Sequence, residues 1–209
     1  MPILADSVQE TIEDDAERYL QMVASGELRP AGVFAMYKAI PFRMYLGTDR
    51  LIGNSLATCR LLVLTKGDEI VYSCYYKVAE NEYFATRAVQ VEVRQTPRYP
   101  GLARAVMRHH FMREFDSLRT DLSGTECGRN MWRQFYKDYR KELHFYKGFV
   151  NIDLRKSDGS NNQDAACPDK VTHLKHMKTG SSLRDEMWHD NKDGNVVVIY
   201  ATKVPLWTE

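Results

Sequence analysis

The sequence predicts an α/β protein of the α+β type, in which helices flank a mixed, mostly antiparallel β-sheet. Three runs of β-branched and aromatic residues, 59–65, 69–78 and 83–93, follow one another along the chain. The turn Lys66-Gly67-Asp68 joins the first two runs as a hairpin. The third run leads through a turn rich in proline and glycine into an amphipathic helix. These observations are the basis for the predicted fold class.

The first forty residues have the character of helices. Ser7 with Glu10 three residues later is a capping-box pattern. An apolar stripe at helical spacing then comprises Val8, Ile12, Ala16, Tyr19, Leu20 and Val23. A break at Gly26 and Pro30 precedes residues 33–40, whose apolar side chains indicate a second helix. Residues 1–42 are therefore expected to hold two helices, preceded at most by a very short strand.

The helix after the proline-glycine turn places its apolar residues on one face, and these are Leu102, Val106, Met107, His110 and Phe111. A short possible strand at 117–122, a helix over 129–141 and an aromatic strand at 144–154 are expected next. The last strand is expected at 194–203.

A long insertion, residues 155–193, separates the last two predicted strands. Its first half, 155–170, is polar and indicates a loop, whereas 171–189 is compatible with a helix interrupted by Gly180. An insertion of this length fits either a device that shapes a pocket or partner surface, or a neutral surface excursion.

Length and composition fit one domain over residues 1–209. We divide it into N-terminal helices (1–42), a core (43–154), the insertion (155–193), and a last strand with its tail (194–209). Hydrophobic residues make up 44% of the 209 residues, enough for a sizeable core. The formal net charge of +1 gives no reason to expect nucleic acid or a membrane as a partner.

The cellular setting is expected to be reducing. The N-terminus is polar where a signal peptide would be apolar, and no run has membrane-spanning length. The four cysteines show no close pairing, which is typical of reduced thiols in a cytoplasm. Cys167, His173 and His176 have loosely metal-like spacing but lack a fourth ligand nearby, so we expect no metal.

The turn Arg98-Tyr99-Pro100-Gly101-Leu102-Ala103 is the main candidate site. It connects a strand to the start of a helix, where unpaired backbone N–H groups and the helix dipole favour a phosphate group. The same pattern also fits an ordinary strand–turn–helix junction.

This turn resembles the pyrophosphate loop of the GCN5-related N-acetyltransferases, the GNAT family. The family pattern is Arg or Gln, two variable residues, Gly, one variable residue, then Gly or Ala, and Val93 matches its apolar strand position. The order of elements over 43–154 is also similar to that of the family. The resemblance implies that acetyl-CoA is bound by Val91, Val93, Arg98, Tyr99, Gly101, Leu102 and Ala103. It also implies a sheet that opens after the strand ending near Val93.

The resemblance further implies transfer of an acetyl group to a primary amine, which requires a base and an acid. Glu92 lies on the strand that often supplies the base, and a surface carboxylate is the other interpretation. Family members often place a tyrosine acid where this chain has Trp132, whose indole N–H does not act as an acid at neutral pH. Tyr136, one turn later, is the candidate replacement, although it equally fits a packed aromatic.

Two functions from different classes remain open. One is an N-acetyltransferase whose amine acceptor is a protein lysine, a protein N-terminus or a small polyamine-like molecule. The other is a catalytically inactive protein of the same fold that serves as a structural or protein-binding component. Compact, divergent chains of this kind also resemble proteins encoded by bacteriophages, including those carried in virions. A cytoplasmic location, or a virion, is therefore expected, and the oligomeric state is left open.

Overall fold

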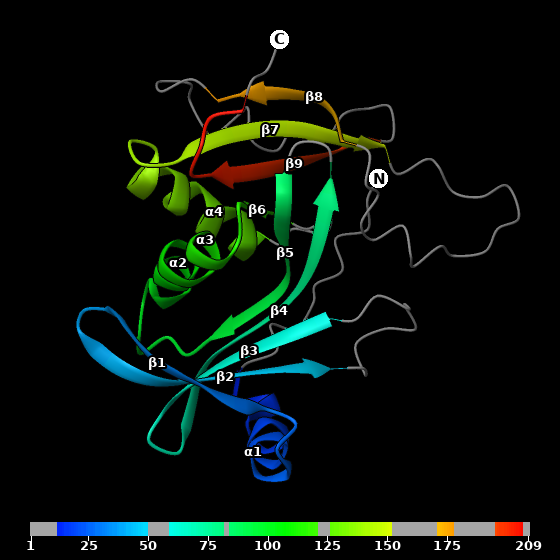
Figure 1. Ribbon diagram of the computed structural model, residues 1–209. Coiled ribbons are helices and arrows are strands. Elements are labelled where there is room, and N and C mark those ends of the chain that lie inside the picture. The colour runs from blue at the N-terminus through cyan, green and yellow to red at the C-terminus, as the bar shows by residue number, and fades with distance from the viewer. Residues whose placement is uncertain are drawn as a thin grey trace, which may run out of the picture.

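The computed structural model of the chain describes residues 12–49, 59–81, 84–120, 126–151, 171–177 and 195–206. In these residues it shows one nine-stranded sheet with strand order β1-β2-β3-β4-β5-β6-β9-β7-β8. Helices α2, α3 and α4 cover one face of this sheet, and α1 lies at the end formed by β1 to β4 (Figure 1). The expected mixed α/β class with a mostly antiparallel sheet is confirmed.

The elements have the following bounds. The strands are β1 (Arg29–Tyr37), β2 (Ile40–Asp49), β3 (Cys59–Lys66), β4 (Glu69–Asn81), β5 (Phe84–Gln95), β6 (Ser117–Arg119), β7 (His144–Asn151), β8 (Val171–His176) and β9 (Asn195–Thr202). The helices are the 3-10 helix η1 (Ile12–Asp15), α1 (Ala16–Ser25), α2 (Leu102–Val106), the π-helix η2 (Met107–Phe111), α3 (Met112–Glu114) and α4 (Glu126–Tyr139).

The predicted run of three strands is confirmed as the antiparallel meander β3–β4–β5. The next strand, β6, pairs parallel to β5, because the α2–η2–α3 helix carries the chain back to the same end of the sheet. β9 then pairs antiparallel to β6 on one side and to β7 on the other. The last two predicted strands are therefore neighbours in the sheet although the insertion separates them in the sequence.

The sheet has a hydrophobic core on each face. The larger core joins α2, η2 and α4 to inward-facing residues of β1 to β7 and of β9. It includes four of the five residues predicted for the apolar face of the loop helix, and the fifth, His110, is buried. The smaller core lies on the opposite face, where Tyr19 and Met22 of α1 pack with Leu61, Val63 and Tyr75. Leu20 of the predicted stripe is 42% exposed and does not belong to either core.

The second N-terminal helix predicted within residues 1–42 is wrong, because residues 29–37 and 40–49 form the antiparallel hairpin β1–β2. Phe34 and Tyr37 are the buried residues of β1, and a register irregularity lies between them. This irregularity spaces the two inward-facing residues three apart, which imitates helical periodicity. The capping-box residues Ser7 and Glu10, and the short first strand, lie outside the described residues.

The prediction for the insertion is partly wrong. Its residues 171–176 form the strand β8, which pairs antiparallel to β7 at one edge of the sheet, where a helix was expected. Residues 152–170 and 178–194 lie outside the described residues. None of the described helices is both long enough and apolar enough to cross a membrane.

Candidate functional site

The candidate phosphate loop follows β5 and turns into α2 at Gly101. Gly101 has φ of 89°, in the left-handed region that favours glycine. The hydroxyl group of Tyr37 donates a hydrogen bond of 3.0 Å to the carbonyl oxygen of Pro100. The ring of Tyr99 packs edge-on against Tyr37 and Phe42. The mispredicted β1–β2 hairpin thus holds the loop from one side.

Two backbone amides at the start of α2 have partners within the protein. The N–H of Leu102 donates to the carbonyl oxygen of Tyr99 at 3.0 Å. The N–H of Ala103 donates to the side-chain oxygen Oε1 of Gln95 at 2.9 Å. The neutral oxygen of Gln95 thus occupies the position at the helix start where a charged oxygen of a bound anion would accept the same hydrogen bond.

Two arginines flank the loop. Arg98, whose side chain is 64% exposed, forms an ion pair of 2.5 Å with Glu69 at the start of β4. The guanidinium group of Arg104 lies over Gly101, since a Cβ added there would be 3.1 Å from its Nη2 atom. Arg104 also pairs with Asp138 of α4 at 2.8 Å. Both arginines can turn toward a phosphate because their present ion pairs are largely exposed.

The strand that leads to the loop changes its pairing just before the candidate residues. Tyr75 of β4 pairs with Glu92, but the next residue, Tyr76, pairs with Gln90, so Val91 forms a bulge. Within the described residues, the pairing of β5 with β6 ends at Val89. Val93 is partly buried and packs against the larger core. Among the described residues, β6 therefore provides no pairing partner for β5 beyond Val89, and whether the sheet opens there to admit a cofactor stays a prediction.

The two candidate proton-transfer residues lie on different faces of the sheet. The carboxylate of Glu92 binds the guanidinium group of Arg94 at 2.5 Å, and Arg94 also binds Asp15 of η1 at 2.6 Å. This network is on the face covered by α1. Tyr136 is 1% exposed and belongs to the larger core, where its ring lies 4.9 Å from that of Phe145. The structure does not bring Glu92 and Tyr136 together.

Trp132 occupies the position where the family resemblance places an acid. It is 3% exposed and packs edge-on against Phe135 of the same helix. Tyr139, a further tyrosine of α4, has a pKa raised by burial, and the nearby carboxylates of Asp138 and Glu142 act in the same direction. The rings of Phe135 and Tyr136 contact that of Phe145 and so join α4 to β7.

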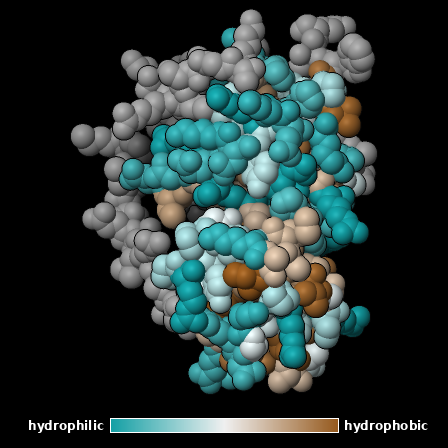
Figure 2. Space-filling model, turned by 90° about the vertical axis from the view of Figure 1, so that its left-hand side faces the viewer, coloured by the Kyte–Doolittle hydropathy of each residue, from teal (hydrophilic) through white to brown (hydrophobic). Residues whose placement is uncertain are grey.

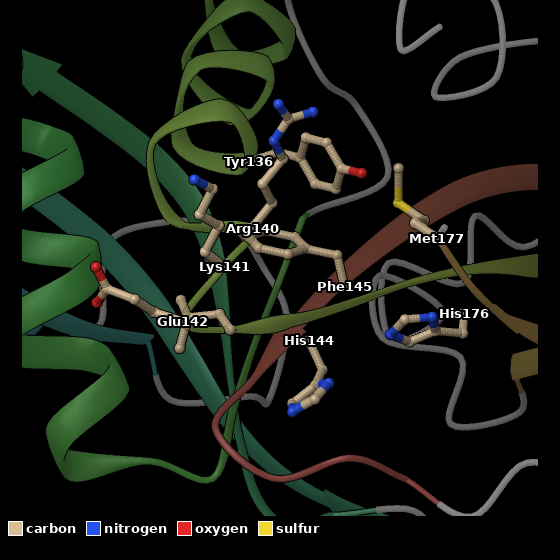
Figure 3. Close-up of a pocket in the computed structure, with 9 residues that line it drawn as sticks. Tyr136, Arg140, Lys141, Glu142, His144, Phe145, His176 and Met177 are labelled. Atoms are coloured by element: carbon tan, nitrogen blue, oxygen red, sulfur yellow. The ribbon is translucent and has the colours of Figure 1, made fainter. Parts of the chain in front are cut away.

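A cavity of about 220 Å³ lies at the turn between α4 and β7 and reaches the end of β8 (Figure 3). Tyr136 is the one predicted site residue among the described residues that line it. The other lining residues are Arg140, Lys141, Glu142, Leu143, His144, Phe145, His176 and Met177.

Sequence reasoning missed Tyr37 and Gln95 as parts of the loop site. Tyr37 lies 63 positions before its partner Pro100, so no local pattern could reveal the contact. Gln95 is the last residue of β5, and a glutamine at a strand end has no special signal. Gln95 and Ala103 are eight residues apart, and only the folded loop brings the side chain of one to the N–H of the other.

No group of three or more histidine, cysteine, aspartate or glutamate residues within the described parts of the chain could hold a metal ion. Cys167, which the sequence placed in a weak metal-like pattern with His173 and His176, lies outside the described residues. Comparisons with family models, with curated proteins and with solved structures each find no match to this chain.

Proposed function

We propose that this chain is an N-acetyltransferase of the GNAT type, which moves an acetyl group from acetyl-CoA to a primary amine. The observation that carries the proposal is the arrangement at the end of β5. Its pairing with the parallel neighbour β6 ends at Val89, the bulge at Val91 follows, and the glycine-bearing loop then opens directly into the α2–η2–α3 helix. The sequence pattern that resembles the GNAT loop and the structural features at the end of β5 thus involve the same residues.

The loop residues fit a pyrophosphate group. The amide of Ala103 already donates to an oxygen atom, that of Gln95, and this side chain can rotate away when a charged oxygen replaces it. Gly101 has no side chain, so its backbone becomes accessible once the guanidinium group of Arg104 moves from above it. Arg98 and Arg104 flank the loop and can add positive charge. The dipole of the helix adds a modest share, about 0.3–1 kcal/mol at an exposed end.

The chemistry that we propose uses the opened edge of β5. Backbone N–H groups beside the bulge at Val91 are suited to donate to the thioester oxygen as negative charge develops on it. Glu92 would take a proton from the amine, directly or through water, and for this it must leave Arg94. The carbon–sulfur bond breaks as the amine nitrogen bonds to the carbonyl carbon. For Tyr136 to supply a proton to the departing sulfur, its side chain must leave the larger core, because Glu92 lies on the opposite face of the sheet.

A second candidate is a protein of the same fold that no longer catalyses and acts as a structural or protein-binding component. Two observations favour it specifically. Trp132 is buried where an acid is expected, and Glu92 is held in an ion pair on the face opposite Tyr136. A phage origin and a place in a virion remain proposals attached to this second candidate.

The test is an acceptor screen at saturating acetyl-CoA, with release of free thiol as the measurement. Lysine peptides, peptide N-termini and polyamines are the three acceptor classes to compare. Thiol release that depends on one class, with mass spectrometry showing the acetylated amine, supports the enzyme. Tight binding of acetyl-CoA with no acetylated product in any class would favour the second candidate.

A further inference from the structure

The strand β1 forms one edge of the sheet and leaves most of its side chains in solvent. Among the described strands it pairs with β2 alone, so the backbone N–H and C=O groups on its outer side face no other strand. Only Phe34 and Tyr37 of this strand are buried, whereas Val33 is 64% exposed and Met36 is 59% exposed. Figure 1 shows the β1–β2 hairpin at the end of the sheet opposite to β8. Exposed apolar side chains on an edge strand are the features to which a further strand can add.

β1 lacks the charged side chains that natural proteins place within edge strands to prevent pairing with another chain. No charged residue lies between Arg29 and Lys38. The strand at the other edge of the sheet, β8, differs, because it carries the exposed residues Lys175 and His176. One edge of the sheet is thus protected by charge, and the edge at β1 is not.

Contacts with the loop after β5 fix the position of β1. The hydroxyl group of Tyr37 donates a hydrogen bond of 3.0 Å to the carbonyl oxygen of Pro100, and its ring packs edge-on against that of Tyr99. Phe34 and Tyr37 both belong to the larger core. A strand that is already ordered loses little further entropy when a second strand pairs with it.

The length of β1 that can accept a regular partner is short. Pro30 has no N–H to donate. The register with β2 shifts between Pro30 and Gly32, and again between Phe34 and Tyr37. Such irregularities bend and twist a strand and so disfavour contact between two long, flat strands. The edge therefore suits a short extended segment better than the edge of another sheet.

The charge around the exposed residues of β1 is positive throughout. Residues 28–48 contain Arg29, Lys38 and Arg43 and no aspartate or glutamate. These three cations are exposed, and none of them forms an ion pair with another described residue. Arg43 pairs with Val33 across the hairpin, so the two side chains lie on the same face. A second copy of the chain would bring like charges together at this edge, whereas a segment that carries carboxylates would neutralise them.

We propose that β1 binds a short, extended, acidic segment of a partner protein, which adds to the sheet as a further strand. Main-chain hydrogen bonds to β1 hold the segment, and its apolar side chains pack on Val33 and Met36. Carboxylates at its ends face Arg29, Lys38 and Arg43. The proposal applies to either candidate function and does not depend on acetyl-CoA binding.

The probe is the fluorescent peptide Asp-Val-Thr-Val-Thr-Val-Asp, titrated with the full chain and followed by fluorescence anisotropy. Saturable binding is expected, and hydrogen exchange of the β1 amides should slow when the peptide is present. Met36→Asp should raise the Kd at least about tenfold, because an apolar contact is replaced by a charge that repels the peptide. Val204→Asp is the matched control, since Val204 is 69% exposed and follows β9, and it should change the Kd less than about twofold.

Two altered peptides separate the parts of the proposed contact. The peptide Lys-Val-Thr-Val-Thr-Val-Lys should bind at least about tenfold more weakly, because its charges repel the cations of the hairpin. A version of the acidic peptide with methylated backbone nitrogens should also bind at least about tenfold more weakly, because it cannot donate main-chain hydrogen bonds. Arg43→Gln should raise the Kd of the acidic peptide about two- to fivefold, the range expected for an exposed ion pair.

Several results would overturn the proposal. They are the absence of saturable binding of the acidic peptide, equal binding of the acidic and basic peptides, and equal weakening by Met36→Asp and Val204→Asp. Unchanged binding of the methylated peptide would exclude strand addition. Self-association of the parent chain that Met36→Asp abolishes would assign the edge to a second copy instead. Met36 and Val204 are both exposed, so their replacement should leave the fold intact, as circular dichroism can check.

Discussion

Individual side chains account for how the loop after β5 is held. The hydroxyl group of Tyr37 donates a hydrogen bond to the carbonyl oxygen of Pro100, and the side-chain oxygen of Gln95 accepts one from the N–H of Ala103. The left-handed conformation of Gly101 allows the chain to turn between them. Only Gly101 could be predicted from the sequence, because a glycine in a turn is a local signal. The contacts of Tyr37 and Gln95 depend on the folded chain.

His110 gives the protein a pH-dependent contribution to stability. Burial lowers its pKa, as does the charge of Arg113, while Glu114 raises it. A histidine whose pKa is lower when folded protonates first in the unfolded chain. Its contribution to the free energy of unfolding is therefore complete above the ordinary histidine pKa of about 6.5 and falls away as the pH drops below it.

We predict that the free energy of unfolding, measured in urea, decreases from pH 7 to pH 5, and that His110→Leu makes this decrease smaller. His176→Gln, at an exposed position, is the control and should keep the parent's decrease. An unchanged pH dependence in His110→Leu would contradict the prediction.

At the same scale, Glu92→Gln and Tyr136→Phe test the proposed proton transfers. Each substitution should lower kcat by about 10²–10⁴-fold, the range typical of positioned acids and bases. The affinity for acetyl-CoA should remain close to that of the parent, since neither side chain is expected to touch the phosphates. Steady-state kinetics on the amine found in the screen provide the measurement, and unchanged kcat in both variants would remove these residues from the mechanism.

At the scale of elements, the β1–β2 hairpin is the clearest failure of prediction from sequence. Its turn residues Lys38 and Ala39 have φ of 48° and 55°, values that usually call for asparagine and glycine. The hairpin therefore lacks its usual sequence signal. β1 is also an edge strand with exposed Val33 and Met36, so it lacks the alternation that identifies a half-buried strand. Figure 2 views the left-hand side of Figure 1 and shows hydrophobic residues interspersed with hydrophilic ones in the lower part of the molecule, while the upper part is mostly hydrophilic.

We predict that Ala39→Gly stabilises the protein. A left-handed conformation costs a non-glycine residue about 1–2 kcal/mol, whereas the flexibility of glycine in the unfolded chain costs about 0.5–1 kcal/mol. The net gain should be between about 0 and 1.5 kcal/mol in the free energy of unfolding, measured by urea denaturation. Ala35→Gly, an exposed residue within β1, is the matched control and should instead destabilise. Destabilisation by both substitutions would show that the turn is not strained.

At the scale of the whole molecule, the central part of the fold follows from the sequence and its edges do not. The meander β3–β4–β5, the loop helix, α4, β7 and β9 were predicted because each has a strong local pattern of apolar residues. β9 lies between β6 and β7, and this place follows from pairing among distant segments. The edge strands β1 and β8 each pair with one neighbour, so burial constrains their sequences less and leaves a weaker pattern.

The central claim is that the loop at Gly101 binds acetyl-CoA, and a calorimetric titration of three proteins tests it most directly. The variants are Gly101→Asp and Gly26→Asp, since Gly26 has a similar φ of 81° at the end of α1, away from the loop. Both variants should lose about 1–2 kcal/mol of stability from backbone strain. The parent and Gly26→Asp should bind acetyl-CoA with one-to-one stoichiometry, and Gly101→Asp should not bind, because its carboxylate repels the phosphates. Equal binding by all three proteins, or no binding by the parent, would contradict the claim.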